Sequence, residues 1–133
     1  MNASISHNLE TVRAQIAEAA ARSGRRASEI ELVAVSKTHG PETILEALDA
    51  GQLLLGENRV QEARAKMPLL PGRVRWHLIG HLQSNKVRQA LLAFERIHAV
   101  DSLELARDIN RVAAELGLFP KVLLELNVAG EAS

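Results

Sequence analysis

The sequence contains no cysteine and no tyrosine, and it has only three aromatic side chains, which are Trp76, Phe94 and Phe119. Without cysteine, a disulfide framework, a thiolate zinc site and a cysteine nucleophile are all excluded. Three aromatic residues are too few to build the stacking platforms on which single-stranded nucleic acids bind. The core must therefore be built from alanine, leucine, valine and isoleucine.

The chain also lacks an excess of charge and a long apolar run. Its 133 residues include 16 Lys+Arg and 16 Asp+Glu, a balance that argues against binding to nucleic acid or to an anionic membrane. No apolar run is long enough for a transmembrane helix, and residues 1–7 lack the basic start and apolar core of a signal peptide. We therefore expect a cytoplasmic protein with one domain over residues 1–133, or part of a larger domain.

A unit of one strand and one helix recurs along most of the chain. Helical periodicity predicts an N-terminal helix over residues 5–23, capped by Ser4 or Ser6. Short apolar runs then start at intervals of about 22 residues, which is typical of a parallel sheet. The pattern predicts strands at 31–35, 53–55, 74–79, 97–100 and 121–126, and helices at 42–50, 60–67, 84–94 and 102–116. Gly117 and Pro120 are expected to end the last of these helices.

Two α/β architectures fit this repeat: a doubly wound open sheet and a (β/α)8 TIM barrel. No Gly-x-Gly-x-x-Gly motif follows any predicted strand, which weakens a dinucleotide-binding interpretation. A barrel needs eight strands and typically about 250 residues, whereas the pattern predicts five strands. If the fold is a barrel, we expect one truncated to about five β/α units, with free edges that favour self-association.

Polar side chains follow the predicted strands at their carboxyl ends, where parallel α/β folds place their chemistry. Each group also has a structural interpretation: Asp101-Ser102, Ser84 and Asn85 as helix caps, Glu57 as an acid at a helix start, and His98 as a satisfied core or interface histidine. His77 and His81 lack the helical spacing of a metal pair, and no third ligand is evident, so we expect no metal site. The polar groups occur at 36–39, 56–59, 76–77, 80–86, 101–102 and 127.

Lys37 is the strongest single candidate for chemistry. Strand alternation places it on the same face as Val33 and Val35. An ammonium at the end of an apolar strand face either reaches solvent or occupies a prepared site. Burial lowers the pKa of a lysine and makes its amine available for a Schiff base. The alternative is a plain solvated lysine at a strand end.

Four segments carry a resemblance to a known family. The chain resembles the YggS-type pyridoxal 5'-phosphate (PLP) homeostasis proteins over residues from about 5 to 133, with the motifs in the family's order. The resemblance implies the fold of the N-terminal domain of bacterial alanine racemase, a (β/α)8 TIM barrel of PLP fold type III. The segments are VAVSKT at 33–38, GENRVQE at 56–62, WHLIGHLQSNK at 76–86 and LELNV at 124–128.

The resemblance also implies a cofactor site. Lys37 would form the covalent imine with the aldehyde of PLP, and Asn58 would lie beside the cofactor ring. Four further residues would line the same cofactor site, namely His77, His81, Ser84 and Asn85. Family members usually continue for about 100 residues, and their later segments hold the cofactor phosphate. We therefore expect the imine to supply most of the affinity of this chain for PLP.

In function, the resemblance implies a carrier that buffers PLP inside the cell and exchanges it with PLP-dependent apo-enzymes. Full-length members of the family are monomers. No catalytic residue is expected, because the family lacks the catalytic tyrosine of the racemase and this chain has no tyrosine. One alternative is a weak PLP-dependent racemase-like enzyme in which His81 offers one acid–base group. Another is an interaction module that docks a partner through its N-terminal helix.

Overall fold

The computed structural model describes residues 4–130 and 132, which form an α/β arrangement. The strands are β1 (Ala34–Val35), β2 (Leu54–Glu57), β3 (Arg75–Leu78), β4 (Arg96–Val100) and β5 (Lys121–Leu124). The α-helices are α1 (Ile5–Arg22), α2 (Pro41–Asp49), α3 (Val60–Lys66), α4 (Val87–Ala93) and α5 (Leu103–Leu116). Short 3-10 helices are η1 (Ala27–Glu29), η2 (Met67–Leu69) and η3 (Ser84–Lys86).

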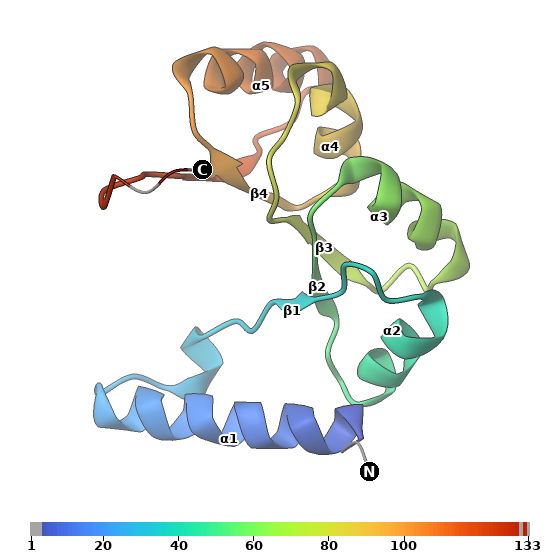
Figure 1. The fold of residues 1–133 in the computed structure, drawn as a ribbon, viewed down its shortest axis with the longest axis vertical. Coiled ribbons are helices and arrows are strands. Elements are labelled where there is room, and N and C mark those ends of the chain that lie inside the picture. Colours follow the sequence, from blue (N-terminus) through green and yellow to red (C-terminus); the bar gives the residue numbers. More distant parts are fainter. Residues whose placement is uncertain (1–3, 131, 133) are drawn as a thin grey trace.

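The five strands are parallel and lie in chain order, β1-β2-β3-β4-β5. A doubly wound sheet reverses its strand order at a switch point, so this order excludes that alternative. It confirms the barrel-type α/β prediction, in which each strand pairs with the next one along the chain. Within the described residues the sheet is not closed, and it bends into an arc with α2, α3, α4 and α5 on its outer side (Figure 1).

The outer face of the sheet carries the hydrophobic core. Leu55, Trp76, Leu78 and Ile97 come from three neighbouring strands, and all four are buried in one cluster with side chains of α2 to α5. Helix α5 contributes an apolar face whose members are spaced three or four residues apart, namely Leu105, Ile109, Val112 and Ala113. Successive side chains of a strand point to opposite faces of the sheet, so one set packs against the helices and the other set lies on the inner face.

Helix ends follow the predicted signals in most places. The Ser102 hydroxyl accepts a hydrogen bond from the Leu105 N–H at 3.1 Å and caps α5, and the Ser4 hydroxyl caps α1 through the His7 N–H at 3.1 Å. Gly117 ends α5 with a φ of 68°, a left-handed conformation that glycine adopts at little cost. The predicted caps Ser84 and Asn85 are wrong, because η3 and α4 have no side-chain cap.

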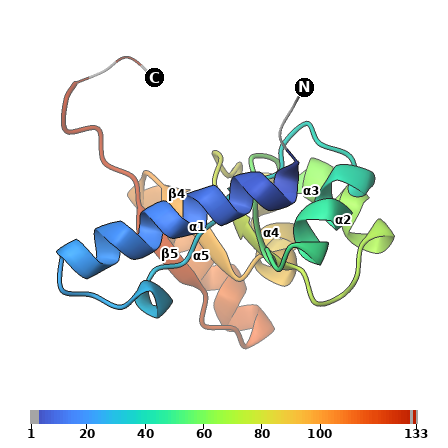
Figure 2. The ribbon, with the colours of Figure 1, turned by 90° about the horizontal axis from the view of Figure 1, so that it is seen from below.

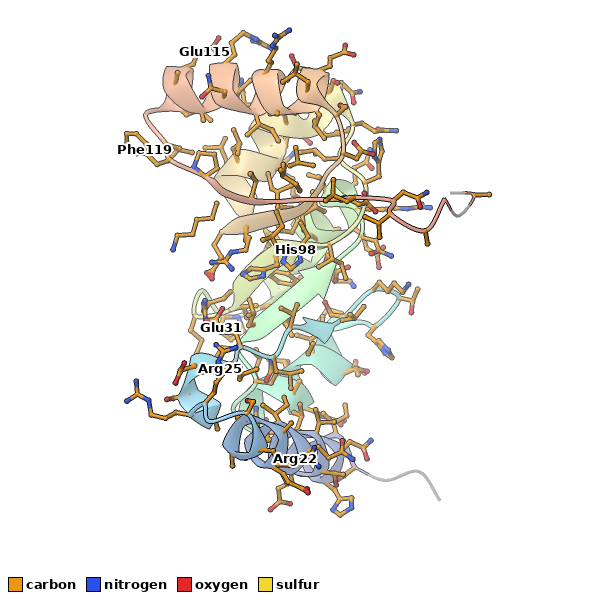
Figure 3. The ribbon with its side chains drawn as sticks, turned by 90° about the vertical axis from the view of Figure 1, so that its left-hand side faces the viewer. Arg22, Arg25, Glu31, His98, Glu115 and Phe119 are labelled. Atoms are coloured by element: carbon orange, nitrogen blue, oxygen red, sulfur yellow. The ribbon has the colours of Figure 1, made fainter. Side chains whose placement is uncertain are left out.

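The inner face of the sheet is open. Figure 3 looks onto this side of the molecule, where His98 lies near the centre and Glu31 lies below it. The first strand was predicted over residues 31–35, but only Ala34 and Val35 are paired, and Val35 is 50% exposed. The Gln52 side-chain amide instead donates to the Leu32 carbonyl at 2.7 Å. A side-chain hydrogen bond therefore takes the place of backbone pairing between strands at Leu32.

Helix α1 lies alongside the β1 end of the sheet, as seen from below in Figure 2. The Arg13 guanidinium joins it to the end of α2, donating to the Ala50 carbonyl at 2.9 Å and to the Gln52 side-chain oxygen at 3.1 Å. In the part of the chain that the structure describes, no helix has both the length and the hydropathy needed to cross a bilayer.

Candidate functional site

Lys37 lies in a tight turn directly after β1. The His39 N–H donates to the Ser36 carbonyl at 3.1 Å, which closes the turn around Lys37 and Thr38. Thr38 has a φ of 66°, and a β-branched residue keeps this left-handed conformation only where its surroundings hold it. The turn is therefore a strained segment whose shape the rest of the fold maintains.

The Lys37 side chain is exposed, so of the two alternatives for an ammonium at this strand end, the one that reaches solvent holds. The physical reason is that Lys37 lies in a turn at the end of β1, an edge strand of the sheet. Among the described residues the Lys37 amine makes no hydrogen bond or ion pair. The structure thus presents a free primary amine at the carboxyl end of β1.

A buried polar network lies beneath this turn. Glu57, Lys66 and Ser36 are 0%, 8% and 4% exposed. The Lys66 ammonium contacts Glu57 Oε1 at 2.6 Å and donates to the Ser36 carbonyl at 2.8 Å, while the Ser36 hydroxyl donates to Glu57 Oε1 at 2.9 Å. The interpretation of Glu57 as an acid at a helix start is therefore wrong. Glu57 ends β2 and is the buried counter-ion of Lys66.

Glu62 completes the network on the solvent side. Its Oε1 accepts a hydrogen bond from the Thr38 N–H at 2.8 Å and lies 3.2 Å from the Lys66 ammonium. The Thr38 N–H and then Lys66 hold the pKa of the Glu62 carboxyl below its usual value. Glu62 and Lys66 were not among the predicted site residues. Their four-residue spacing on a predicted helix was the available signal.

Asn58 lies in the loop after β2, where it contacts the loop after β3. A Cβ added to Gly80 would lie 2.3 Å from the Asn58 carbonyl oxygen and 2.8 Å from its Cα, so the two backbones approach as closely as only glycine permits. Val35 pairs with Gly56, and Lys37 and Asn58 each follow two residues later, just beyond the carboxyl ends of the adjacent strands β1 and β2. Both therefore lie at the same edge of the sheet.

A cavity of about 470 Å³ opens between these two loops. Its lining includes the cations Arg59 and Lys86, the amides Asn58 and Gln83, and His81. His81 is largely exposed, and its Nδ1 lies 3.7 Å from Asp101 Oδ2. Of the predicted site residues, the cavity brings together Asn58 and His81.

The remaining predicted site residues lie elsewhere. Lys37, His77, Ser84 and Asn85 are not part of the lining of this cavity. Ser84 and Asn85 are exposed in η3. Their place at a cofactor stays a prediction, as does that of His77.

His77 lies within β3 and is 2% exposed. Its Nδ1 is 3.0 Å from Nε2 of His98, and the two rings are tilted with centroids 5.0 Å apart. Its Nε2 lies 3.4 Å from Glu95 Oε1 and has no hydrogen-bond partner among the described residues; the contact is an ion pair only when the histidine is protonated. Burial holds the pKa of both histidines below the usual value. His77 is thus buried within β3 and in contact with His98.

The described residues contain no group of three or more His, Cys, Asp or Glu side chains placed to hold a metal ion. The polar groups at this end of the sheet include the Lys37 amine, the amides of Asn58 and Gln83, and His81.

Comparisons with known proteins identify the family of the chain. The family described as "Alanine racemase, N-terminal domain" matches residues 3–131. The chain is 44% identical, over 97% of its length and 57% of the relative, to the pyridoxal phosphate homeostasis protein of Escherichia coli (strain K12). It is 39% identical, over 92% of its length and 51% of the relative, to the protein of the same name from Schizosaccharomyces pombe. The chain spans a little over half the length of these relatives.

Solved structures of PipY from Synechococcus elongatus PCC7942 share the fold. The structure without PLP is 43% identical with a TM-score of 0.81, over 93% of this chain and 54% of that chain. The structure with PLP bound is 48% identical with a TM-score of 0.74, over 89% of this chain and 57% of that chain. The strand order, the helices on the outer face and the match over residues 3–131 lead to one assignment. The chain belongs to the alanine racemase N-terminal domain family.

Proposed function

We propose that the protein binds PLP covalently through Lys37 and serves as a carrier that buffers the cofactor in the cell. The observation that carries the proposal is the free amine of Lys37, presented at the sheet edge by a turn whose flanking backbone is held by side chains. The names of the matched relatives and the PLP-bound PipY structure support the same cofactor.

The described residues fit the aldehyde-bearing end of such a cofactor. PLP supplies an aldehyde, with which a primary amine condenses with release of one water molecule. The exposure of Lys37 makes its amine accessible to an aldehyde that arrives from solvent. Asn58, at the same edge of the sheet, offers an amide to the ring. We assign no described residue to the phosphate.

A carrier role fits the surroundings of Lys37 better than turnover does. Inversion at an amino-acid α-carbon needs proton donors and acceptors on both faces of the bound substrate. In the described part of the chain, His77 is engaged by His98, and His81 pairs with Asp101. The sequence has no tyrosine. We propose that release to PLP-dependent apo-enzymes, rather than catalysis, is the physiological step.

The test compares absorbance spectra during titration with PLP. Wild-type protein should develop the band of a protonated lysine–PLP adduct, and Lys37→Ala and Lys37→Arg should not, because neither offers a primary amine at this position. Lys121→Ala is the matched control, since Lys121 is exposed on β5. It should behave as wild type. A full-strength band in Lys37→Ala would contradict the proposal.

The same samples separate the carrier from the enzyme. The protein should transfer PLP to an apo-enzyme of defined PLP dependence, which is measured by recovery of that enzyme's activity. Racemisation of alanine that requires Lys37 would instead support catalysis and contradict the carrier role.

A further inference from the structure

The peptide groups on both sides of Lys37 are held by side chains of one helix, α3. The carbonyl of the Ser36–Lys37 peptide accepts from the Lys66 ammonium at 2.8 Å. The N–H of the Lys37–Thr38 peptide donates to Glu62 Oε1 at 2.8 Å. These two peptide planes set φ and ψ of Lys37, so they also set the direction in which its Cα–Cβ bond points.

Lys66 is itself fixed from below. Its ammonium contacts Glu57 Oε1 at 2.6 Å, and the Ser36 hydroxyl donates to the same carboxylate oxygen at 2.9 Å. Glu57 is fully buried at the end of β2, and its second oxygen, Oε2, has no hydrogen-bond partner among the described residues. A buried ion pair of this kind is weak evidence for stability but is well suited to fixing one geometry.

The conformation of Thr38 shows that the turn needs this support. A φ of 66° is unfavourable for threonine, and such strain persists where the surroundings over-determine the backbone. The Thr38 N–H has its acceptor in Glu62, and the Ser36 carbonyl accepts from both the His39 N–H and Lys66. The strained Thr38 thus lies between its own N–H, held by Glu62, and the His39 N–H, which donates to the same Ser36 carbonyl that Lys66 holds.

We infer that Glu62 and Lys66 are positioning residues. Together with Glu57 and Ser36 they hold the turn so that the Lys37 amine is presented at the carboxyl end of β1. This inference rests on the proposed function for its consequence, which is faster and tighter capture of PLP. Its structural part, the immobilised turn, is independent of any ligand.

The test centres on Glu62, because its side chain is 32% exposed and its removal leaves the core intact. Amide hydrogen exchange of Thr38 is measured in the protein without PLP, followed by the rate and affinity of PLP binding. Glu62→Ala should speed Thr38 exchange at least tenfold and slow PLP capture at least fivefold. Glu62→Gln should rescue both, because its amide oxygen still accepts from the Thr38 N–H.

Two further variants complete the design. Glu46→Ala removes an exposed acid of α2 and should match wild type in both measurements. The double variant Glu57→Gln/Lys66→Met removes the buried pair without leaving a lone charge, and it should reproduce the Glu62→Ala phenotype. Circular dichroism checks the folded state of each variant.

Unchanged Thr38 exchange and unchanged PLP capture in Glu62→Ala would overturn the inference. Faster Thr38 exchange in Glu62→Ala with unchanged PLP capture would also overturn it. Glu62 would then order the turn without affecting how Lys37 captures PLP. If wild-type protein failed to capture PLP at all, the proposed function would fail, whereas the exchange result would still decide whether α3 holds the turn.

Discussion

Replacing Gly80 by alanine tests the contact that joins the loops after β2 and β3. The new Cβ would lie 2.3 Å from the Asn58 carbonyl oxygen, 2.8 Å from its Cα and 2.9 Å from its carbonyl carbon. Ordinary carbon contacts are about 3.5 Å or longer, so one of the two backbones must move by about 1 Å. All three atoms belong to backbone, which cannot rotate away as a side chain does.

We expect Gly80→Ala to cost about 1–3 kcal/mol of unfolding free energy, the usual range for overpacking. With a urea dependence of about 2 kcal/mol per molar, the unfolding midpoint should fall by about 0.5–1.5 M. The same shift should move Asn58 and weaken PLP binding, measured by titration. Urea unfolding followed by circular dichroism gives the midpoint directly.

Gly72→Ala is the matched control, because no heavy atom lies within 4 Å of its added Cβ and its φ is not left-handed. It should be neutral or stabilising by a few tenths of a kcal/mol, through the lower entropy of the unfolded chain. If the midpoint of Gly80→Ala equalled that of Gly72→Ala, the close approach of the two loops would be refuted.

Three other measurements probe the rest of the fold. Leu78→Ala removes a fully buried side chain and should cost about 2–5 kcal/mol in urea unfolding; a loss below about 1 kcal/mol would contradict its place in the core. Ser102→Ala should cost about 1 kcal/mol, whereas Ser102→Asp should keep the cap, and equal losses in both would refute the capping role. Burial lowers the pKa of His77 and His98, so the unfolded chain binds protons that the folded one does not. The free energy of unfolding should therefore fall as the pH drops below about 6.5, and His98→Gln should make it depend less on pH. An unchanged pH dependence in that variant would argue against this role of the two histidines.

The local elements were largely predictable because their signals are local. The apolar runs located the strands, and Ser4, Ser102 and Gly117 marked helix ends through hydrogen bonds that span only a few residues. The strand order was not predictable from the repeat alone, because both α/β architectures share the same alternation of strand and helix. The order β1 to β5 comes from pairing between strands.

The site was predictable only in part, because its key contacts join distant segments. Lys37 and Asn58 stand out in their motifs, but Glu57 gives no local sign that it is buried beside Lys66. The exposure of Lys37 depends on what covers the open face, which the sequence around it does not encode. The network that holds its turn combines residues from β1, β2 and α3, and it emerges only once they are folded together.

The most direct test of the account identifies which amine captures PLP. The protein is incubated with PLP, reduced with borohydride and digested, and the modified lysine is located by mass spectrometry. We expect one predominant label, on Lys37, with Lys66 protected by its buried contact with Glu57. A predominant label on Lys66, Lys86 or Lys121, or an even spread over the lysines, would contradict it.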